Sequence, residues 1–277
     1  MNLKMLILII LALIFLASNS LLVKFALIQN SIDAFSFTFI RILSGAFVLS
    51  LYLLYKDKRL NFSLKNSFYS SLALFSYAMA FSYAYLGLEA GIGTLILFSS
   101  VQLSMIILAL FKKERFNIKQ FLGLVLAFLG LVYLLYPSQD FVLSYLHVFL
   151  IIIAGISWAF YSVLGKNKKN ILKLSAQNFV FASFFIVIFY ILFRPDIYLT
   201  QEGVLLALLS GILTSAFAYV LWYYILQHIQ ILTASIIQLA VPIIAIFISV
   251  LFLKELFTFK LILASVIILC GISLSLI

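Results

Sequence analysis

Charged residues are scarce in this sequence: aspartate, glutamate, lysine and arginine make up 9% of its 277 residues. An ordinary soluble domain is about 25% charged and about 45–50% apolar, whereas 66% of this chain is apolar. So few charges cannot cover a surface that faces water, which excludes a soluble globular protein. The sequence therefore predicts an integral membrane protein.

Cysteine, histidine and acidic residues are also few. The single cysteine, Cys270, lies in an apolar run, which excludes a disulfide and a cysteine metal site. His147 and His228 lie far apart in sequence, so we expect no metal site, no catalytic residue and no cofactor. A Gly-rich phosphate-binding loop is absent, so ATP is not the expected energy source. No carboxylate lies deep within an apolar run, which leaves Glu89 as the candidate for proton coupling.

Long apolar runs fill the chain. A helix that crosses a bilayer needs about 20 mostly apolar residues. The sequence predicts ten such helices, at roughly 5–28, 34–55, 66–86, 91–111, 118–136, 145–164, 175–193, 204–225, 232–253 and 260–276. The first run could imitate a cleaved signal peptide, but its apolar pattern continues to Ile28, so we expect it to stay uncleaved. The expected fold class is all-α and integral to the membrane.

Lysines and arginines set the expected orientation. With the N-terminus inside, 13 basic residues fall on the inner side and three on the outer side, and Lys24 and Arg41 fall within helices. We therefore expect both termini to be cytoplasmic. The net charge of +10 could suggest nucleic acid. Short basic clusters between apolar runs are instead typical of cytoplasmic membrane loops, so we expect no nucleic-acid partner.

The sequence repeats at about half its length. An offset of 141 residues superposes Lys113–Glu114 on Lys254–Glu255, each pair at the end of an apolar run. We interpret both glutamates as architectural, pairing with basic neighbours to close a loop. The repeat divides the chain into five-helix units, residues 1–136 and 137–277. Because five is odd, the second unit must cross the membrane in the opposite direction, and inverted repeats are a recurring design of secondary transporters.

Several motifs from both halves carry a resemblance to a known family. They are Asn19–Lys24, Arg41–Ala46, the run from Ala84 through Lys113–Phe116 to Gly130, Ala218–Tyr224, Pro242, Lys254–Glu255 and Gly271. On these motifs the chain resembles the EamA family of the drug/metabolite transporter superfamily over nearly its whole length. The resemblance implies ten helices in two inverted repeats around a central cavity, and transport without enzymatic activity. It does not specify the substrate, because members move amino acids, metabolites, nucleotide-like cofactors and drugs.

Polar side chains inside a membrane are costly and usually face the bundle interior or a water-filled cavity. We predict these substrate-binding residues: Asn19, Arg41, Tyr77, Ser99, Gln102, Trp158, Tyr161, Tyr219 and Gln238. Serines can instead pack helices together, and aromatic rings can instead anchor helix ends at the interface. Pro242 removes a backbone donor and frees a carbonyl near Gln238, which indicates either a hinge or a static kink.

Two charges are embedded in the predicted helices. Lys24 and Arg41 could form a basic pair that attracts a carboxylate or phosphate of the substrate. Alternatively they could snorkel outward or pair with Asp33 and Glu89. Both possibilities stay open at the level of the sequence.

We therefore predict a secondary transporter that moves a small organic solute, an amino acid or related metabolite, by alternating access. We expect it to lie in the bacterial inner membrane and to export the solute. Its partners are the solute and the lipid bilayer. One alternative is a multidrug or nucleoside-like cofactor transporter. Others are a channel and a membrane-embedded enzyme on lipid-linked substrates, although such an enzyme should cluster His, Asp or Glu at a membrane face. Gly123 and Ala127 permit a close helix contact, within the chain or between two chains.

Overall fold

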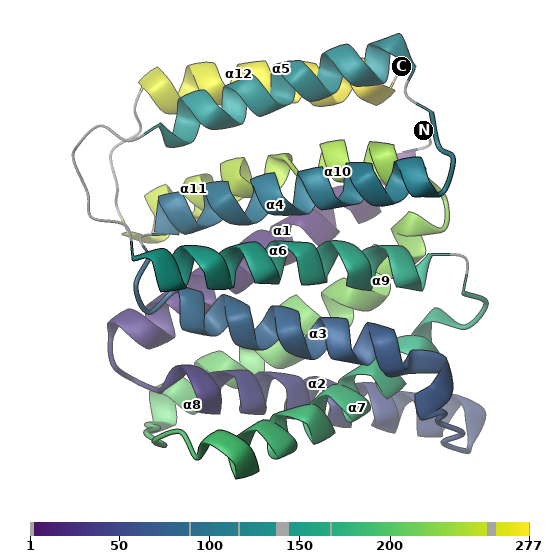
Figure 1. Cartoon of the computed structure of the whole chain (residues 1–277), viewed down its shortest axis with the longest axis vertical. Helices are drawn as coiled ribbons and strands as arrows, with labels where there is room; N and C mark the ends of the chain where they lie inside the picture. Colours follow the sequence, from purple (N-terminus) through teal and green to yellow (C-terminus); the bar gives the residue numbers. More distant parts are fainter. Residues whose placement is uncertain are drawn as a thin grey trace.

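The chain is all-helical over the residues that the computed structural model describes, which are 3–88, 90–115, 117–136, 144–166, 168–253 and 259–276 (Figure 1). The one addition is an isolated antiparallel bridge between Ile32 and Leu199, in two loops. The predicted all-α class is confirmed.

The first repeat contains five helices: α1 (Leu3–Ile28), α2 (Ala34–Asp57), α3 (Leu64–Ala84), α4 (Ala90–Phe111) and α5 (Ile118–Leu135). In the second repeat α8, η1 and α9 follow one another without a gap, and a short break separates α10 from α11. Its elements are α6 (Tyr145–Gly165), α7 (Ile171–Phe193), α8 (Gln201–Leu209), η1 (Ser210–Phe217), α9 (Ala218–Leu226), α10 (Ile231–Ile237), α11 (Ala240–Leu253) and α12 (Phe259–Leu276). Within the described residues, these elements correspond to the ten predicted helices.

Five helical runs are long and apolar enough to cross a membrane, by length and composition, among the residues described: α1, α2, α6, α7 and the run Gln201–Leu226. Shorter apolar stretches lie at Ile96–Phe111, Ile118–Gly130, Ile231–Ala245 and Ile262–Ser275. α3 is long enough but less apolar, and several of its buried positions are serines.

Side chains in the loops fix where several helices begin. Asp33 accepts a hydrogen bond from the backbone nitrogen of Ser36, and Asn170 accepts one from that of Lys173. Before α5, Asn117 forms a capping box with Gln120. Such residues satisfy backbone donors that the first turn of a helix leaves free. Capping side chains in the short loops therefore determine where these helices begin.

The helices lie side by side in one bundle, with α5 and α12 paired at one end (Figure 1). Small residues allow this pairing, since a Cβ atom at Gly123 would meet the carbonyl oxygen of Gly271, and one at Gly271 would meet Ala127. The close contact that Gly123 and Ala127 permit thus lies within the chain. α1 begins and α12 ends on the same side of the bundle, which we call the terminal side (Figure 1). The charge distribution predicts this side to be cytoplasmic.

Candidate substrate site

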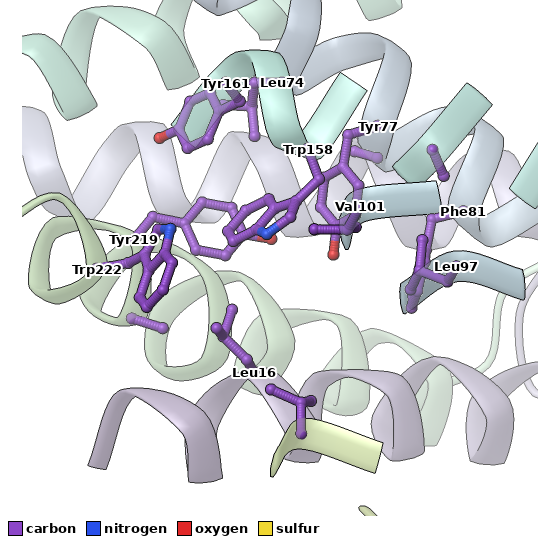
Figure 2. Packing of buried hydrophobic residues seen from close by; sticks show 14 of the residues in the cluster. Leu16, Leu74, Tyr77, Phe81, Leu97, Val101, Trp158, Tyr161, Tyr219 and Trp222 are labelled. Carbon is purple, nitrogen blue, oxygen red and sulfur yellow. The ribbon is translucent and has the colours of Figure 1, made fainter. Parts of the chain in front are cut away.

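Aromatic side chains from both repeats meet in the middle of the bundle. Tyr77 on α3 lies against Trp158 on α6, with ring centroids 5.0 Å apart, and Trp158 lies 4.8 Å from Tyr219 on α9 (Figure 2). Tyr161 stacks on Trp158, with ring centroids 5.7 Å apart, and lies at the same distance from Tyr219. All four rings are buried. The structure therefore brings together four of the predicted site residues, one from the first repeat and three from the second.

A small cavity of about 20 Å³ lies beside these rings. Its wall is formed by Leu16, Ser20, Tyr77, Phe81, Leu97, Phe98, Val101, Trp158 and Gln238. A cavity of this size holds about one water molecule, so the structure represents a closed state of the site. Of the predicted site residues, Tyr77, Trp158 and Gln238 line the cavity.

The break between α10 and α11 places Gln238 in the cavity wall. Pro242 has no backbone N–H, so the carbonyl of Gln238 loses its usual helical partner and accepts from the nitrogen of Val241 at 3.0 Å instead. The side-chain oxygen of Gln238 accepts from Trp158 Nε1 at 2.7 Å. Its Nε2 donates to the sulfur of Met105 at 3.1 Å. Discontinuous helices of this kind line binding sites in many transporters.

Arg41 is completely buried behind this wall. Its Nε donates to Ser215 Oγ at 2.7 Å, and its Nη2 donates to the hydroxyl of Tyr219. Its Cζ lies 5.4 Å from the ring centroid of Tyr77 and 5.9 Å from that of Phe81. Nη1 has no hydrogen-bond partner among the described residues. Among the residues that the structure describes, every contact of the guanidinium is thus with a neutral group.

The acidic residues considered as partners of Arg41 are engaged elsewhere or lie outside the described residues. The carboxylate of Asp33 accepts from the backbone nitrogens of Ser36 and Tyr198. Glu89, the candidate for proton coupling, falls outside the part of the chain that the structure describes. Within that part, the only ion pair joins Lys166 and Glu114.

Ser215, which accepts from Arg41, was not among the predicted site residues. It belongs to η1, a π-helical segment, and such segments occur frequently at functional sites. Gly211 in the same segment lies so close to α2 that a Cβ atom would collide with the carbonyl oxygen of Arg41. Ser210, Gly211, Thr214 and Ser215 put four small or hydroxyl residues within six positions, which is a weak sequence signal for a close helix contact.

Besides Arg41 and Tyr219, four predicted site residues do not line the cavity in this closed state. Asn19 accepts from Ser210 Oγ at 2.7 Å and from Thr214 Oγ1 at 3.2 Å, which connects α1 to η1. Gln102 donates to Ser235 at 3.3 Å, which connects α4 to α10. Ser99 and Tyr161 do not line the cavity either. Ser99 is partly buried, and the buried hydroxyl of Tyr161 has no hydrogen-bond partner among the described residues.

Lys24 binds backbone carbonyls and not a carboxylate among the described residues. Its Nζ donates to the carbonyls of Leu88 at 2.9 Å and Tyr85 at 3.4 Å, just beyond α3. In the second repeat, Lys166 donates to the carbonyl of Ile229 at 2.7 Å. The two lysines are 142 positions apart and the two principal acceptors 141 apart. An equivalent contact therefore recurs in each repeat, within one position of the repeat offset.

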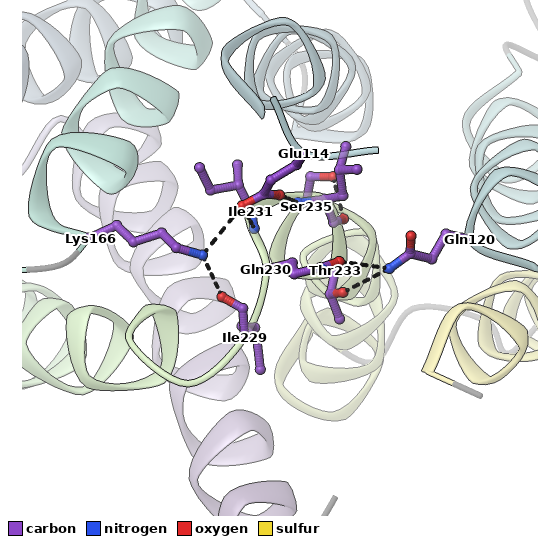
Figure 3. A network of polar contacts seen from close by, with 9 residues as sticks. Glu114, Gln120, Lys166, Ile229, Gln230, Ile231, Thr233 and Ser235 are labelled. Carbon is purple, nitrogen blue, oxygen red and sulfur yellow. Dashed lines mark hydrogen bonds and ion pairs between the residues drawn. The ribbon is translucent and has the colours of Figure 1, made fainter. Parts of the chain in front are cut away.

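A polar network joins the two repeats at the terminal side (Figure 3). The carboxylate of Glu114, after α4, accepts from the backbone nitrogens of Ile231 and Leu232, each at 3.1 Å. Lys166 lies 3.5 Å from the same carboxylate. A carboxylate at the start of a helix is favoured by the free N–H groups and the helix dipole. We call Glu114, Lys166 and the first turn of α10 the Glu114 network.

The loops on the opposite side are also joined across the repeats. The backbone nitrogen of Asp33 donates to the carbonyl of Tyr198 at 2.8 Å, and that of Thr200 donates to Ser31 at 2.8 Å. These bonds connect the α1–α2 loop to the segment before α8. Contacts between repeats thus flank the central cavity on both sides of the bundle.

Comparisons with known proteins agree with this architecture. The profile of the EamA-like transporter family matches residues 3–136 and again residues 146–277. An uncharacterized protein of Pseudomonas aeruginosa is 37% identical over 239 residues, which cover 86% of this chain and 83% of that protein. The uncharacterized transporter YoaV of Bacillus subtilis is 24% identical over 257 residues, covering 88% and 87%. A crystal structure shares the fold with a TM-score of 0.82 at 16% identity, over 99% of this chain and 96% of that one. This chain belongs to the EamA-like transporter family and is a multi-pass membrane transporter.

Proposed function

We propose that this transporter carries an amino acid or a related small metabolite, and that it exports this solute across the bacterial inner membrane by alternating access. The observation that carries the proposal is the closed centre, where Tyr77 of the first repeat meets Trp158 and Gln238 of the second. Aromatic walls with a few polar groups suit a small organic molecule that has both apolar and polar parts.

The two halves, which we propose as residues 1–136 and 137–277, rock against each other around this centre. A solute larger than water cannot enter the cavity of about 20 Å³, so one side of the bundle must separate before binding. On the terminal side, separation breaks the Glu114 network. On the opposite side, it breaks the bonds between the loops at Asp33 and Thr200. The break at Gln238 supplies a hinge in the wall, as proposed for Pro242.

Transport then runs as uniport or exchange down a solute gradient. Among the residues that the structure describes, none of those lining the central cavity is acidic, so they offer no carboxylate proton relay at the centre. Coupling to protons would instead involve Glu89, which lies outside those residues. The two mechanisms differ in whether collapse of the proton gradient stops transport.

Counterflow in proteoliposomes tests the proposal. Vesicles loaded with unlabelled amino acid should transiently accumulate the labelled form, and the rate should saturate with concentration. Gln238→Ala should raise the half-saturating concentration because it removes the bond to Trp158 in the cavity wall. The matched control is Phe47→Leu, since Phe47 is 66% exposed on the outer surface of α2. Flux without counterflow would indicate a channel, and the absence of flux for every amino acid and related metabolite would overturn the proposal.

A further inference from the structure

Arg41 is an unusual group to find completely buried in a membrane protein. A charged group inside a bundle is costly unless a charge of opposite sign or a full set of hydrogen bonds compensates it. Among the described residues Arg41 has neither, because it contacts two hydroxyl groups and two aromatic rings and its Nη1 has no partner there. A position that costs stability in this way calls for a functional reason.

The free donors of Arg41 match a carboxylate. A guanidinium carries five N–H donors in a planar fork. The bonds to Ser215 and Tyr219 use the Nε donor and one Nη2 donor. Both Nη1 donors and the second Nη2 donor remain. One donor from each of these two nitrogens forms the end of the fork, which can bind a carboxylate through two parallel hydrogen bonds. Ser215 and Tyr219 hold the other edge of the group and thereby fix its orientation.

The position of Arg41 connects it to the central cavity. The rings of Tyr77 and Phe81 line the cavity and also lie against the guanidinium. In the closed state, these rings contribute cation–π contacts that partly compensate the charge. Movement of the two rings would expose the free end of the fork to a solute in the cavity.

We propose that Arg41 binds the carboxylate of the transported solute, so that a carboxylate is required for high-affinity binding. This inference rests on the proposed function, because it places the solute in the cavity beside Tyr77. Tyr77 and Phe81 cover the guanidinium when the site is empty, and the carboxylate takes their place when the solute is bound. Lys24 has no part in this site, since it binds carbonyls at the end of α3.

Acid and amide pairs of equal shape provide the test. Thermal stability of the purified full chain is measured with L-phenylalanine and L-phenylalaninamide, L-leucine and L-leucinamide, and 3-phenylpropionate and 3-phenylpropanamide. The last pair lacks the ammonium group and isolates the carboxylate. Hydrogen bonds to charged groups predict that at least one acid binds about 10- to 100-fold more tightly than its amide. A chain that binds no acid better than its amide overturns the inference.

Two substitutions separate the charge from the shape of Arg41. Arg41→Met should remove the preference for the acid while the amide binds as before, and without solute it should raise the melting temperature because an uncompensated buried charge is gone. Arg41→Lys keeps the charge but not the fork and should retain only part of the preference. Phe47→Leu on the same helix is the control. If Arg41→Met folds and still prefers the acid, the inference is wrong.

Counterflow distinguishes this inference from the proposed function. If the wild-type protein exchanges the amides as fast as the acids, the result supports transport of small metabolites but refutes the requirement for a carboxylate. If neither acids nor amides exchange, the proposed function fails first. Acid-selective exchange that Arg41→Met abolishes supports both.

Discussion

Weakening the Glu114 network should open the terminal side of the bundle. Glu114 belongs to the first repeat, and its three partners, Ile231, Leu232 and Lys166, belong to the second. Any motion that separates the repeats on this side must break these contacts. Glu114→Gln keeps the size of the side chain and one acceptor oxygen, but it removes the charge and the second acceptor.

The size of the effect follows from the bonds lost. A hydrogen bond to a charged group contributes about 1.5–3 kcal/mol, and the glutamine loses one of the two bonds to backbone nitrogens and weakens the other. The pair with Lys166 adds to the loss because both side chains are mostly buried, at 15% and 14% exposure. Lys166 still keeps its bond to the carbonyl of Ile229. A loss of about 2 kcal/mol corresponds to about a 30-fold larger population of the open state.

Labelling of a buried reporter cysteine measures that population. Cys270→Ser removes the one native cysteine, and Ser235→Cys places a thiol at a position that is 1% exposed and one turn into α10. A membrane-impermeant maleimide is applied to inside-out vesicles or to intact cells. Glu114→Gln should raise the labelling rate about 30-fold from the terminal side, by the same free-energy estimate, and leave the rate from the other side unchanged or lower.

A residue in the same loop provides the control for this experiment. Lys112 is exposed next to the network, and its side chain makes no hydrogen bond or ion pair with another described residue, so Lys112→Gln should leave labelling unchanged. Unchanged labelling in Glu114→Gln, with the protein folded, would show that the network does not hold the repeats together. An equal rise from both sides would indicate general loosening and would also refute the reasoning.

Three further predictions concern single contacts. Trp158→Phe removes the donor to Gln238 and should lower the free energy of unfolding by about 1 kcal/mol, measured by denaturation in detergent. Gly211→Ala should lower the melting temperature more than Trp158→Phe or Lys24→Met does, because the new Cβ atom would collide with the carbonyl of Arg41. An unchanged melting temperature would mean that α2 and η1 are less tightly packed than the structure shows. Lys24→Met should cost about 1 kcal/mol of stability, since two carbonyls lose a donor, while the preference for acid over amide stays as in wild type.

Features that depend on local sequence could be predicted. Apolar runs of sufficient length gave the helices, and the offset of 141 residues between Lys113 and Lys254 gave the two repeats. Pro242 indicated a disturbed helix near Gln238, and the structure places the break there, at Gln238 and Leu239. In each case the cause lies within a few residues of the effect.

Features that depend on distant partners could not be predicted in detail. Glu114 was expected to pair with basic neighbours to close a loop, and it does pair with a lysine, but that lysine is Lys166 in the other repeat. Arg41 binds Ser215 and Tyr219, more than 170 positions away. The small and hydroxyl residues around Ser215 suggest a close helix contact, but they do not predict a π-helical turn. Such contacts follow from how helices pack, and one sequence contains no direct record of that packing.

The repeats are alike at their ends and different at their centre. Lys24 and Lys166 make equivalent contacts within one position of the repeat offset, a symmetry that agrees with the two related packings expected of an alternating-access transporter. At the offset of 141, however, Arg41 falls on Ala182, which is buried and carries no charge. A second guanidinium there would double the cost of buried charge. If Arg41 binds the solute as proposed, this single charge among the described residues of the centre would give an anionic group one orientation, while the similar ends would allow access to the same site from either side.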